Sequence, residues 1–161
     1  MTIKVGDKIP NVTLQHMTSD GVKPITTGEI FNGKRVVLFA VPGAFTPTCS
    51  AKHLPGFVAN ADAIRSKNVD AIACVSVNDA FVMNAWANDQ DVGDKILMLA
   101  DGSASFTRAI GLEHDRTETG MGMRSRRYAM VVDDGVVKFL NVEPPGEFKN
   151  SDADTIRALL G

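Results

Sequence analysis

The chain contains one long apolar segment, within residues 35–41, that runs straight into a proline–glycine turn. A run that is apolar on both faces of an extended chain is typical of a strand buried in a parallel sheet. Pro42 and Gly43 then force a sharp turn, because proline fixes φ and glycine tolerates conformations that other residues avoid. Apolar residues next recur at helical spacing from Leu54 to Ile64. This order predicts a central strand that turns at its end into a helix.

The rest of the chain alternates between strand patterns and helix patterns. Strands are predicted over residues 69–77 and 96–100, and helices over residues 79–88 and 104–110. Two further strand-like runs, residues 128–133 and 136–142, flank Asp134-Gly135, a pair that favours a tight hairpin turn.

The last part of the pattern completes the predicted architecture. Ser151, with Asp154 three residues later, is expected to cap a final helix through Leu160. Residues 115–123 are polar and contain glycine, which predicts a mobile loop. Strand–helix units followed by a hairpin and a terminal helix predict a three-layer α/β domain.

Composition limits what the protein does. With 161 residues, the chain is expected to form one domain over residues 1–161. Its formal net charge of −2 argues against a nucleic-acid surface, because neutralising phosphates needs a basic stripe. No apolar run reaches membrane-spanning length, and the first residues lack the apolar core of a signal peptide. Two cysteines are too few for a disulfide scaffold, so a reducing, cytoplasmic setting is expected.

Cys49 lies where the predicted helix is about to begin. Helix N-termini carry unpaired N–H groups and a partial positive charge, and both favour a thiolate over a thiol. The alternative is an inert core cysteine, the commoner fate of a free thiol. We interpret Cys49 as a reactive sulfur.

The run Pro-Gly-Ala-Phe-Thr-Pro-Thr-Cys-Ser resembles the peroxidatic loop of peroxiredoxins, whose pattern Pro-x-x-x-Thr-x-x-Cys is filled by Pro42, Thr46 and Cys49. The version with Gly-Ala-Phe inside resembles the atypical peroxiredoxin-5, or plant type II, subfamily. The resemblance implies a thioredoxin-like fold with a central mixed β-sheet flanked by helices. Further stretches agree with that subfamily, namely Val5-Gly6-Asp7, His53-Leu54-Pro55-Gly56-Phe57, Val75-Ser76-Val77-Asn78-Asp79 and Asn141-Val142-Glu143-Pro144.

A thiolate is stabilised by a nearby cation, and the chain offers two adjacent arginines, Arg126 and Arg127. The strand period of two places their side chains on opposite faces, so only one of them can point toward Cys49. Spacing alone does not distinguish between them. Resemblance to the family's strand assigns the active-site role to Arg127 and leaves Arg126 in a solvated turn.

The residues around the sulfur have expected roles. Thr46 offers a hydroxyl that can orient a peroxide or donate to the thiolate, and the motif assigns it that role. Pro42 is expected to shield the sulfur from water, and the N–H groups of Cys49 and Ala44 to stabilise the departing oxygen. Phe45 is also expected at the substrate pocket, and as an exposed-looking aromatic it predicts a homodimer interface around the loop.

His53 and Cys74 each have two interpretations. His53 lies four residues after Cys49, which permits a Cys–His pair or a place in the substrate pocket, but a histidine that satisfies backbone groups is favoured. Cys74 falls in a predicted buried strand, which favours an inert core residue. A resolving role is the alternative, because some type II relatives carry a cysteine at this spacing. The C-terminal resolving cysteine of animal-type relatives has no counterpart, since Ser151 occupies that region.

Chemistry and resemblance together predict a thiol peroxidase that serves antioxidant defence. Cys49 attacks hydrogen peroxide or an alkyl hydroperoxide, and glutathione with glutaredoxin, or thioredoxin, then reduces the resulting sulfenic acid. The resemblance implies no metal, haem or flavin, and the histidines and cysteines show no ligand spacing. Two alternatives stay open: a cysteine hydrolase that uses Cys49 and His53, and a non-enzymatic redox sensor that switches on oxidation of Cys49.

Overall fold

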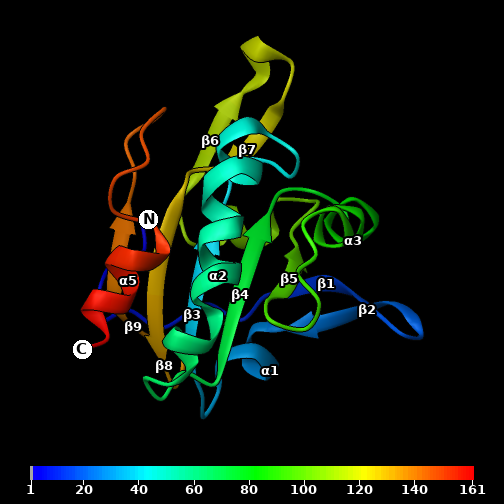
Figure 1. The fold of residues 1–161 in the computed structure, drawn as a ribbon. Coiled ribbons are helices and arrows are strands. Elements are labelled where there is room, and N and C mark those ends of the chain that lie inside the picture. The colour runs from blue at the N-terminus through cyan, green and yellow to red at the C-terminus, as the bar shows by residue number, and fades with distance from the viewer. Residues whose placement is uncertain (1) are drawn as a thin grey trace.

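A computed structural model describes residues 2–161 of the chain. Within these residues, seven strands form one mixed sheet in the order β2-β1-β5-β4-β3-β8-β9, and β6 and β7 form a separate hairpin (Figure 1). The strands are β1 (Thr13–Thr18), β2 (Gly21–Thr26), β3 (Arg35–Ala40), β4 (Ala71–Ser76), β5 (Leu97–Ala100), β6 (Glu113–Arg116), β7 (Gly122–Ser125), β8 (Tyr128–Asp133) and β9 (Val136–Val142).

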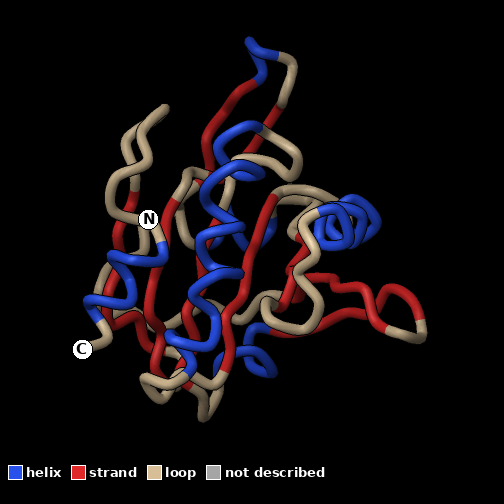
Figure 2. Tube along the Cα trace, in the orientation of Figure 1, coloured by secondary structure: helices blue, strands red, loops and turns tan. Residues whose placement is uncertain are grey.

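Helices pack against both faces of the sheet and give the molecule three layers (Figure 2). One face carries α2 (Leu54–Arg65), α3 (Ala80–Asp89) and α5 (Ala153–Leu159). The other face carries α1 (Thr27–Phe31) and α4 (Ser105–Ala109). A π-helical turn, η1 (Cys49–His53), leads into α2, and a 3₁₀ turn, η2 (Thr117–Thr119), joins β6 to β7.

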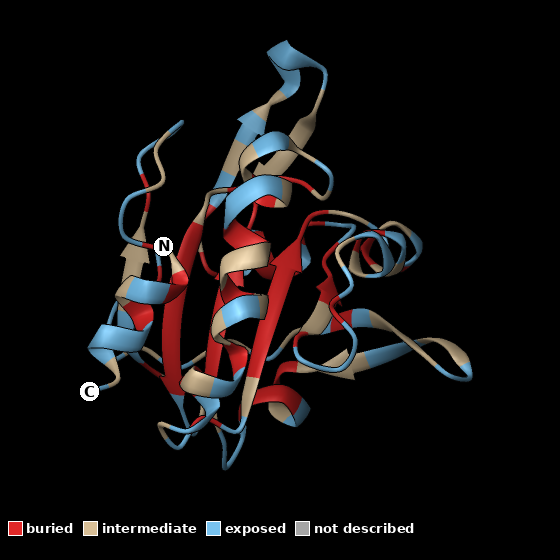
Figure 3. Ribbon diagram, viewed as in Figure 1, coloured by how far each residue is buried: buried red, intermediate tan, exposed pale blue. Residues whose placement is uncertain are grey.

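The core strands β3, β4 and β8 are buried on both faces (Figure 3). Strand β3 is parallel to β4 and antiparallel to β8, so the sheet is mixed. Each face of the sheet carries its own apolar core, and alternate residues of β3 pack into one or the other. Val37 and Phe39 pack on the α2 side, and Val36 and Leu38 pack on the α1 side. The predicted buried central strand, and the mixed sheet flanked by helices, are confirmed.

The other long elements also lie where the sequence predicts them. Helix α3 begins after Asp79, whose side chain accepts a hydrogen bond from the N–H of Val82. Strands β8 and β9 form the predicted hairpin around Asp134-Gly135, where both residues have positive φ, as this kind of turn requires.

Two expectations for shorter segments are wrong, and one pair of strands was missed. Residues 115–123 are not simply a loop, because they contain the end of β6, the turn η2 and the start of β7. Ser151 does not cap the last helix. Asp152 does, since its side chain accepts from the N–H of Thr155, while Ser151 is buried and bonded elsewhere. The β1–β2 hairpin was not predicted at all.

No helix among residues 2–161 is long and apolar enough to cross a membrane.

Candidate active site

Cys49 is fully buried at the point where the chain, having left β3, enters η1. Pro55 has no N–H to donate to the carbonyl of Ala51, four residues earlier, so the regular α-helical bonding is interrupted here. The N–H of Leu54 reaches the carbonyl of Cys49 instead. Helix α2 then starts at Leu54 with Pro55 in its first turn, where proline is tolerated, so the helix continues unbroken.

Thr46 contacts the sulfur of Cys49 from the turn that precedes η1. Its Oγ1 lies 2.8 Å from Sγ of Cys49 and 2.7 Å from the carbonyl oxygen of Gly43. A hydroxyl has one proton, so it donates to only one of these acceptors at a time. When the hydroxyl donates to the carbonyl of Gly43, its oxygen can still accept a hydrogen bond from another O–H group. Thr46 is therefore able to serve either a thiolate or a peroxide O–H.

Arg127 reaches the sulfur from the start of β8. Its Nη2 donates to Sγ of Cys49 over 3.1 Å, and its Nη1 lies 2.8 Å from Nδ1 of His53. The same guanidinium lies 5.7 Å from the centre of the Phe148 ring. The neighbouring Arg126 turns the other way and donates to the carbonyl of Glu143 over 3.3 Å. The structure thus places Arg127, and not Arg126, at the sulfur.

His53 is fully buried and both of its ring nitrogens are engaged. Nε2 lies 2.9 Å from the carbonyl oxygen of Ser151, which only accepts, so Nε2 carries the ring proton and Nδ1 accepts from Arg127. Burial first, and then the charge of Arg127, lowers the pKa of His53 to about 3. The ring also packs 4.9 Å, centre to centre, from both Phe39 and Phe148.

This geometry contradicts the Cys–His hydrolase interpretation. A general base must offer a free nitrogen to the thiol proton, whereas Nδ1 of His53 accepts from a guanidinium and Nε2 is protonated. The favoured sequence interpretation, a histidine that bonds to the backbone, describes its contact with Ser151. The contact with Arg127 was not foreseen.

Glu143 holds together the loop that supplies the Ser151 carbonyl. Its Oε2 accepts hydrogen bonds from the N–H groups of Lys149, Asn150 and Ser151 and from the hydroxyl of Ser151, at 2.7–2.9 Å. Burial alone raises a carboxyl's pKa, but these hydrogen bonds outweigh it and lower the pKa of Glu143. From the sequence, Glu143 was named only as part of a stretch shared with the family, and no role was assigned to it. An acid directly after a strand and before Pro144-Pro145-Gly146 was the available sign.

A pocket of about 310 Å³ is lined by both residues that contact the sulfur, although Cys49 itself is not among its lining residues. Pro42, Thr46 and Arg127 line it, and so do residues of β6 and of the loop after β9. The complete lining is Pro42, Thr46, Pro47, Thr48, His114, Arg116, Arg126, Arg127, Glu143, Pro144, Pro145, Gly146, Glu147 and Phe148.

The structure places the three residues expected at the substrate pocket, Ala44, Phe45 and His53, outside this lining. The N–H of Ala44 donates to Oδ1 of Asn78 over 3.0 Å, so it is already engaged and does not face a departing oxygen. Phe45 has a positive φ of 65° and is 50% exposed, so its side chain is directed to the surface. His53 lies behind Arg127, where its Nδ1 contacts the guanidinium.

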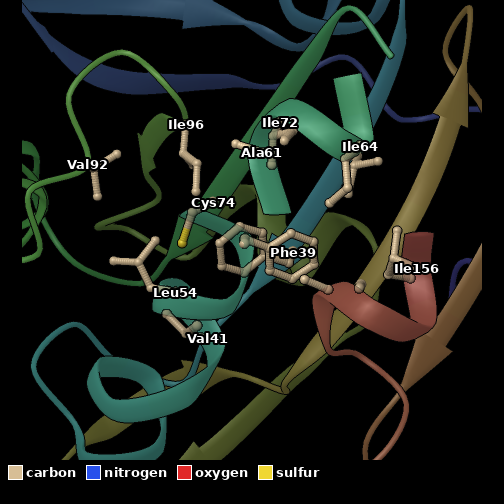
Figure 4. Close-up of a cluster of buried hydrophobic side chains, with 14 of the residues drawn as sticks. Phe39, Val41, Leu54, Ala61, Ile64, Ile72, Cys74, Val92, Ile96 and Ile156 are labelled. Carbon is tan, nitrogen blue, oxygen red and sulfur yellow. The ribbon is translucent and has the colours of Figure 1, made fainter. Parts of the chain in front are cut away.

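Cys74 lies in the middle of β4, opposite Phe39 on β3 (Figure 4). It is fully buried in the same apolar cluster as Cys49, Leu54 and Ile72. Burial first, and then the proximity of Cys49, raises the pKa of the Cys74 thiol well above its usual value. The predicted position in a buried strand is confirmed, and the environment disfavours the thiolate that attacks or resolves.

Among residues 2–161, no group of three or more His, Cys, Asp or Glu side chains is arranged to hold a metal ion. Both cysteines are free thiols.

Comparison with known proteins places this arrangement in a family. The chain matches the family described as Redoxin over residues 4–156. It is 52% identical to the chloroplastic peroxiredoxin-2E of Arabidopsis thaliana, over 98% of this chain and 70% of that protein. It is 46% identical to peroxiredoxin-2B of the same plant, over 98% of both proteins. Among solved structures, reduced Prx3 of Vibrio vulnificus in complex with hydrogen peroxide is 56% identical and superposes with a TM-score of 0.96, covering 99% of this chain and 100% of that one.

Proposed function

The chain belongs to the peroxiredoxin family, in its peroxiredoxin-5 or plant type II branch, and from this membership we propose that Cys49 is the peroxidatic nucleophile of a thiol peroxidase. The thiolate of Cys49 attacks the terminal oxygen of a hydroperoxide, so a sulfur–oxygen bond forms as the oxygen–oxygen bond breaks. The departing oxygen keeps the electron pair and takes a proton, which gives an alcohol, or water from hydrogen peroxide. Cys49 is left as a sulfenic acid.

The observation that carries this proposal is the pair of hydrogen bonds at the sulfur. Arg127 brings a permanent positive charge to 3.1 Å from Sγ, and a charged donor stabilises the thiolate more than a neutral one does. The same guanidinium faces the charge that develops as the oxygen–oxygen bond breaks. Thr46, at 2.8 Å, orients the attacked peroxide through its hydroxyl. Pro42 lines the pocket and adds no N–H donor to compete for the sulfur.

We assign His53 a positioning role. Its neutral imidazole accepts a hydrogen bond from Nη1 of Arg127, and this contact fixes the plane of the guanidinium so that Nη2 faces the sulfur. Because the pKa of His53 is lowered to about 3, the imidazole remains an acceptor over the whole physiological range. A protonated ring would instead repel Arg127.

An external thiol completes the cycle in this proposal. The thiol attacks the sulfenic acid and releases water, and a second thiol reduces the mixed disulfide and restores Cys49. Cys74 is buried with a raised pKa, and Ser151 stands where animal-type relatives have a resolving cysteine, so both features favour an external reductant. Glutathione with glutaredoxin is the reductant that the type II resemblance implies, and thioredoxin is the second candidate.

We further propose that residues 1–161 act as one domain, that the protein forms a homodimer, and that it works in a reducing compartment such as the cytoplasm. The large exposed aromatic side chains Phe45 and Phe81 support the homodimer, because a partner would remove them from water. The two free cysteines support the reducing setting.

Peroxide consumption by the purified protein tests the proposed function. Hydrogen peroxide is supplied in excess with glutathione and glutaredoxin in one assay and with thioredoxin and its reductase in another. We expect many turnovers per chain in at least one assay and none in Cys49→Ser. Consumption that stops after one equivalent per chain would support a redox sensor. A protein that consumes no peroxide at all would contradict both interpretations.

A further inference from the structure

The pocket beside Cys49 is larger than a peroxide group needs. Its volume is about 310 Å³, whereas a water-sized group occupies about 30 Å³ in the liquid. Thr46 and Arg127, which both contact the sulfur, are only two of its lining residues. If Cys49 is the peroxidatic nucleophile, as proposed above, the remaining space is open to the body of the molecule that reacts there.

The charged side chains of strand β6 alternate between the pocket and the solvent. Its four residues alternate in exposure: Glu113 and Asp115 are exposed, whereas His114 and Arg116 are half-buried and line the pocket. This follows from the strand period of two, which turns successive side chains to opposite faces. The basic side chains of β6 thus face the pocket and its acidic side chains face away.

Arg126 adds a second guanidinium to the lining, where its Nη2 also donates to the carbonyl of Glu143 over 3.3 Å. The backbone N–H of Arg126 donates to the carbonyl of Leu112 over 2.8 Å, and this bond holds Arg126 next to the start of β6. Across residues 2–161, the ion pairs are Lys149 with Glu147 and Arg157 with Asp154. Arg116 and Arg126 therefore have no carboxylate partner within the described chain.

The two acidic residues of the lining, Glu143 and Glu147, each have partners on the loop after β9, although Oε1 of Glu143 is buried without a hydrogen-bond partner among residues 2–161. Glu147 is paired with Lys149 at 2.7 Å. Oε2 of Glu143 accepts four hydrogen bonds from residues 149–151. The wall of the pocket contributed by the loop after β9 is otherwise apolar, with Pro144, Pro145 and Phe148. The pocket thus combines a cationic side with an apolar side, next to a reactive sulfur.

We propose that His114, Arg116 and Arg126 form a subsite for a carboxylate carried by the small molecule that reacts at Cys49. Guanidinium groups suit this ligand because they bind carboxylates through two parallel hydrogen bonds. The carboxylate belongs either to the hydroperoxide or to the reducing thiol, since both must approach the same sulfur. The subsite gives the protein a preference for anionic reactants over neutral ones of the same size.

Two matched pairs of probes test the subsite and separate its two uses. For the oxidising step, the pair is cumene hydroperoxide and its para-carboxylate derivative. For the reducing step, the pair is 3-mercaptopropionamide and 3-mercaptopropionate, each added to protein previously oxidised by hydrogen peroxide. Rate constants for loss and recovery of the Cys49 thiol are measured by rapid quench and mass spectrometry. The quantity compared between proteins is the rate ratio of the charged to the neutral member of each pair.

The variants are Arg116→Gln, Arg126→Gln and the double variant, with Arg108→Gln as the matched control. Arg108 is exposed on α4 and does not line the pocket. We expect the ratio to fall by at least about threefold in each single variant and further in the double variant, as the loss of a charged hydrogen bond implies. The ratio in Arg108→Gln should remain that of the natural sequence.

A fall in the hydroperoxide ratio assigns the subsite to the oxidising substrate, and a fall in the thiol ratio assigns it to the reductant. Unchanged ratios in both pairs, in variants that hydrogen peroxide still oxidises and whose circular dichroism is native, would overturn the subsite while leaving the peroxidase function in place. Failure of hydrogen peroxide to oxidise Cys49 in the natural sequence would instead contradict the proposed function and the subsite with it.

Discussion

Nη2 of Arg127 donates to the sulfur of Cys49 over 3.1 Å, although 78 positions separate the two residues in the sequence. The sheet brings them together. Strands β3 and β8 are antiparallel neighbours in which Ala40 is paired with Tyr128, so the end of β3 meets the start of β8. The turn that carries Cys49 and the residue before β8 therefore lie at the same end of these two neighbouring strands.

Replacement of Arg127 by glutamine should slow oxidation of Cys49 by hydrogen peroxide about a hundredfold. The variant removes a charged donor that faces both the thiolate and the developing charge, and losses of this kind cost roughly 10²–10³ in rate. The measurement is the second-order rate constant for loss of the Cys49 thiol. Arg126→Gln is the matched control, because Arg126 donates to the carbonyl of Glu143 and not to the sulfur. Equal losses in both variants would contradict the assignment of Arg127.

Protein stability should fall as the pH falls below the ordinary pKa of histidine, and His53 should cause part of the fall. Burial, and then Arg127, lowers the pKa of His53 to about 3 in the folded protein, whereas the unfolded chain takes up the proton near its usual value. The unfolded state therefore binds more protons between these two values. The contribution of His53 is fully present above the unfolded pKa and is lost as the pH falls toward the folded pKa.

The test compares urea unfolding of the natural sequence with that of His53→Gln, whose amide can still accept from Arg127 and donate to Ser151. Between about pH 7 and about pH 5, the natural sequence should lose roughly 2 kcal/mol more unfolding free energy than the variant. Parallel pH profiles would show that His53 is protonated in the folded state or that its ring is not buried.

Turnover should need only one cysteine of the chain. Cys74→Ala removes the buried sulfur of β4 without adding a polar group to an apolar cluster, so it should keep most of its activity in a glutathione–glutaredoxin assay. Intact mass and peptide mapping of the oxidised natural sequence should show no bond between Cys49 and Cys74. Such a disulfide, together with lost turnover in a folded Cys74→Ala protein, would establish Cys74 as a resolving thiol.

Substitution of Phe45 by aspartate should weaken the proposed homodimer. Phe45 is 50% exposed, and an aspartate in its place would put a charge into an apolar interface. Light scattering over a concentration series gives the association state of both proteins. Lys23→Gln, which makes the net charge more negative by the same single unit at an exposed position of the edge strand β2, is the control. A natural sequence that is monomeric at every concentration would contradict the homodimer.

Sequence patterns predicted the elements whose apolar residues face the two cores. Strand β3 was recognisable because it is apolar on both faces, and the hairpin of β8 and β9 because Asp134-Gly135 suits positive φ. The two faces of β8 were also predictable from the period of two, which separates Arg126 from Arg127.

Elements that bury little apolar surface gave weaker patterns. Strand β2 lies at the edge of the sheet and contains Pro24, which an edge strand tolerates but which argues against a strand in the sequence alone. Strand β6 directs His114 and Arg116 toward a pocket and not toward an apolar core, so no hydrophobic alternation marks it.

The contacts that arrange Arg127 lie beyond sequence reasoning for a different reason. His53 joins Arg127 to the carbonyl of Ser151, and Glu143 holds the loop that carries Ser151. These residues come from three separate parts of the chain, and no local spacing relates them. Only the fold shows that a buried acid and a buried histidine support the residue at the sulfur.

A hydroperoxide should convert Cys49 itself to a sulfenic acid, and trapping that product measures the conversion directly. Reduced protein is mixed with one equivalent of hydrogen peroxide in the presence of dimedone, and the adduct is located by peptide mass spectrometry. We expect one adduct per chain, at Cys49, in the natural sequence and in Cys74→Ala, forming much more slowly in Arg127→Gln. An adduct at Cys74, or a Cys49 thiol that survives the peroxide unchanged, would contradict this expectation.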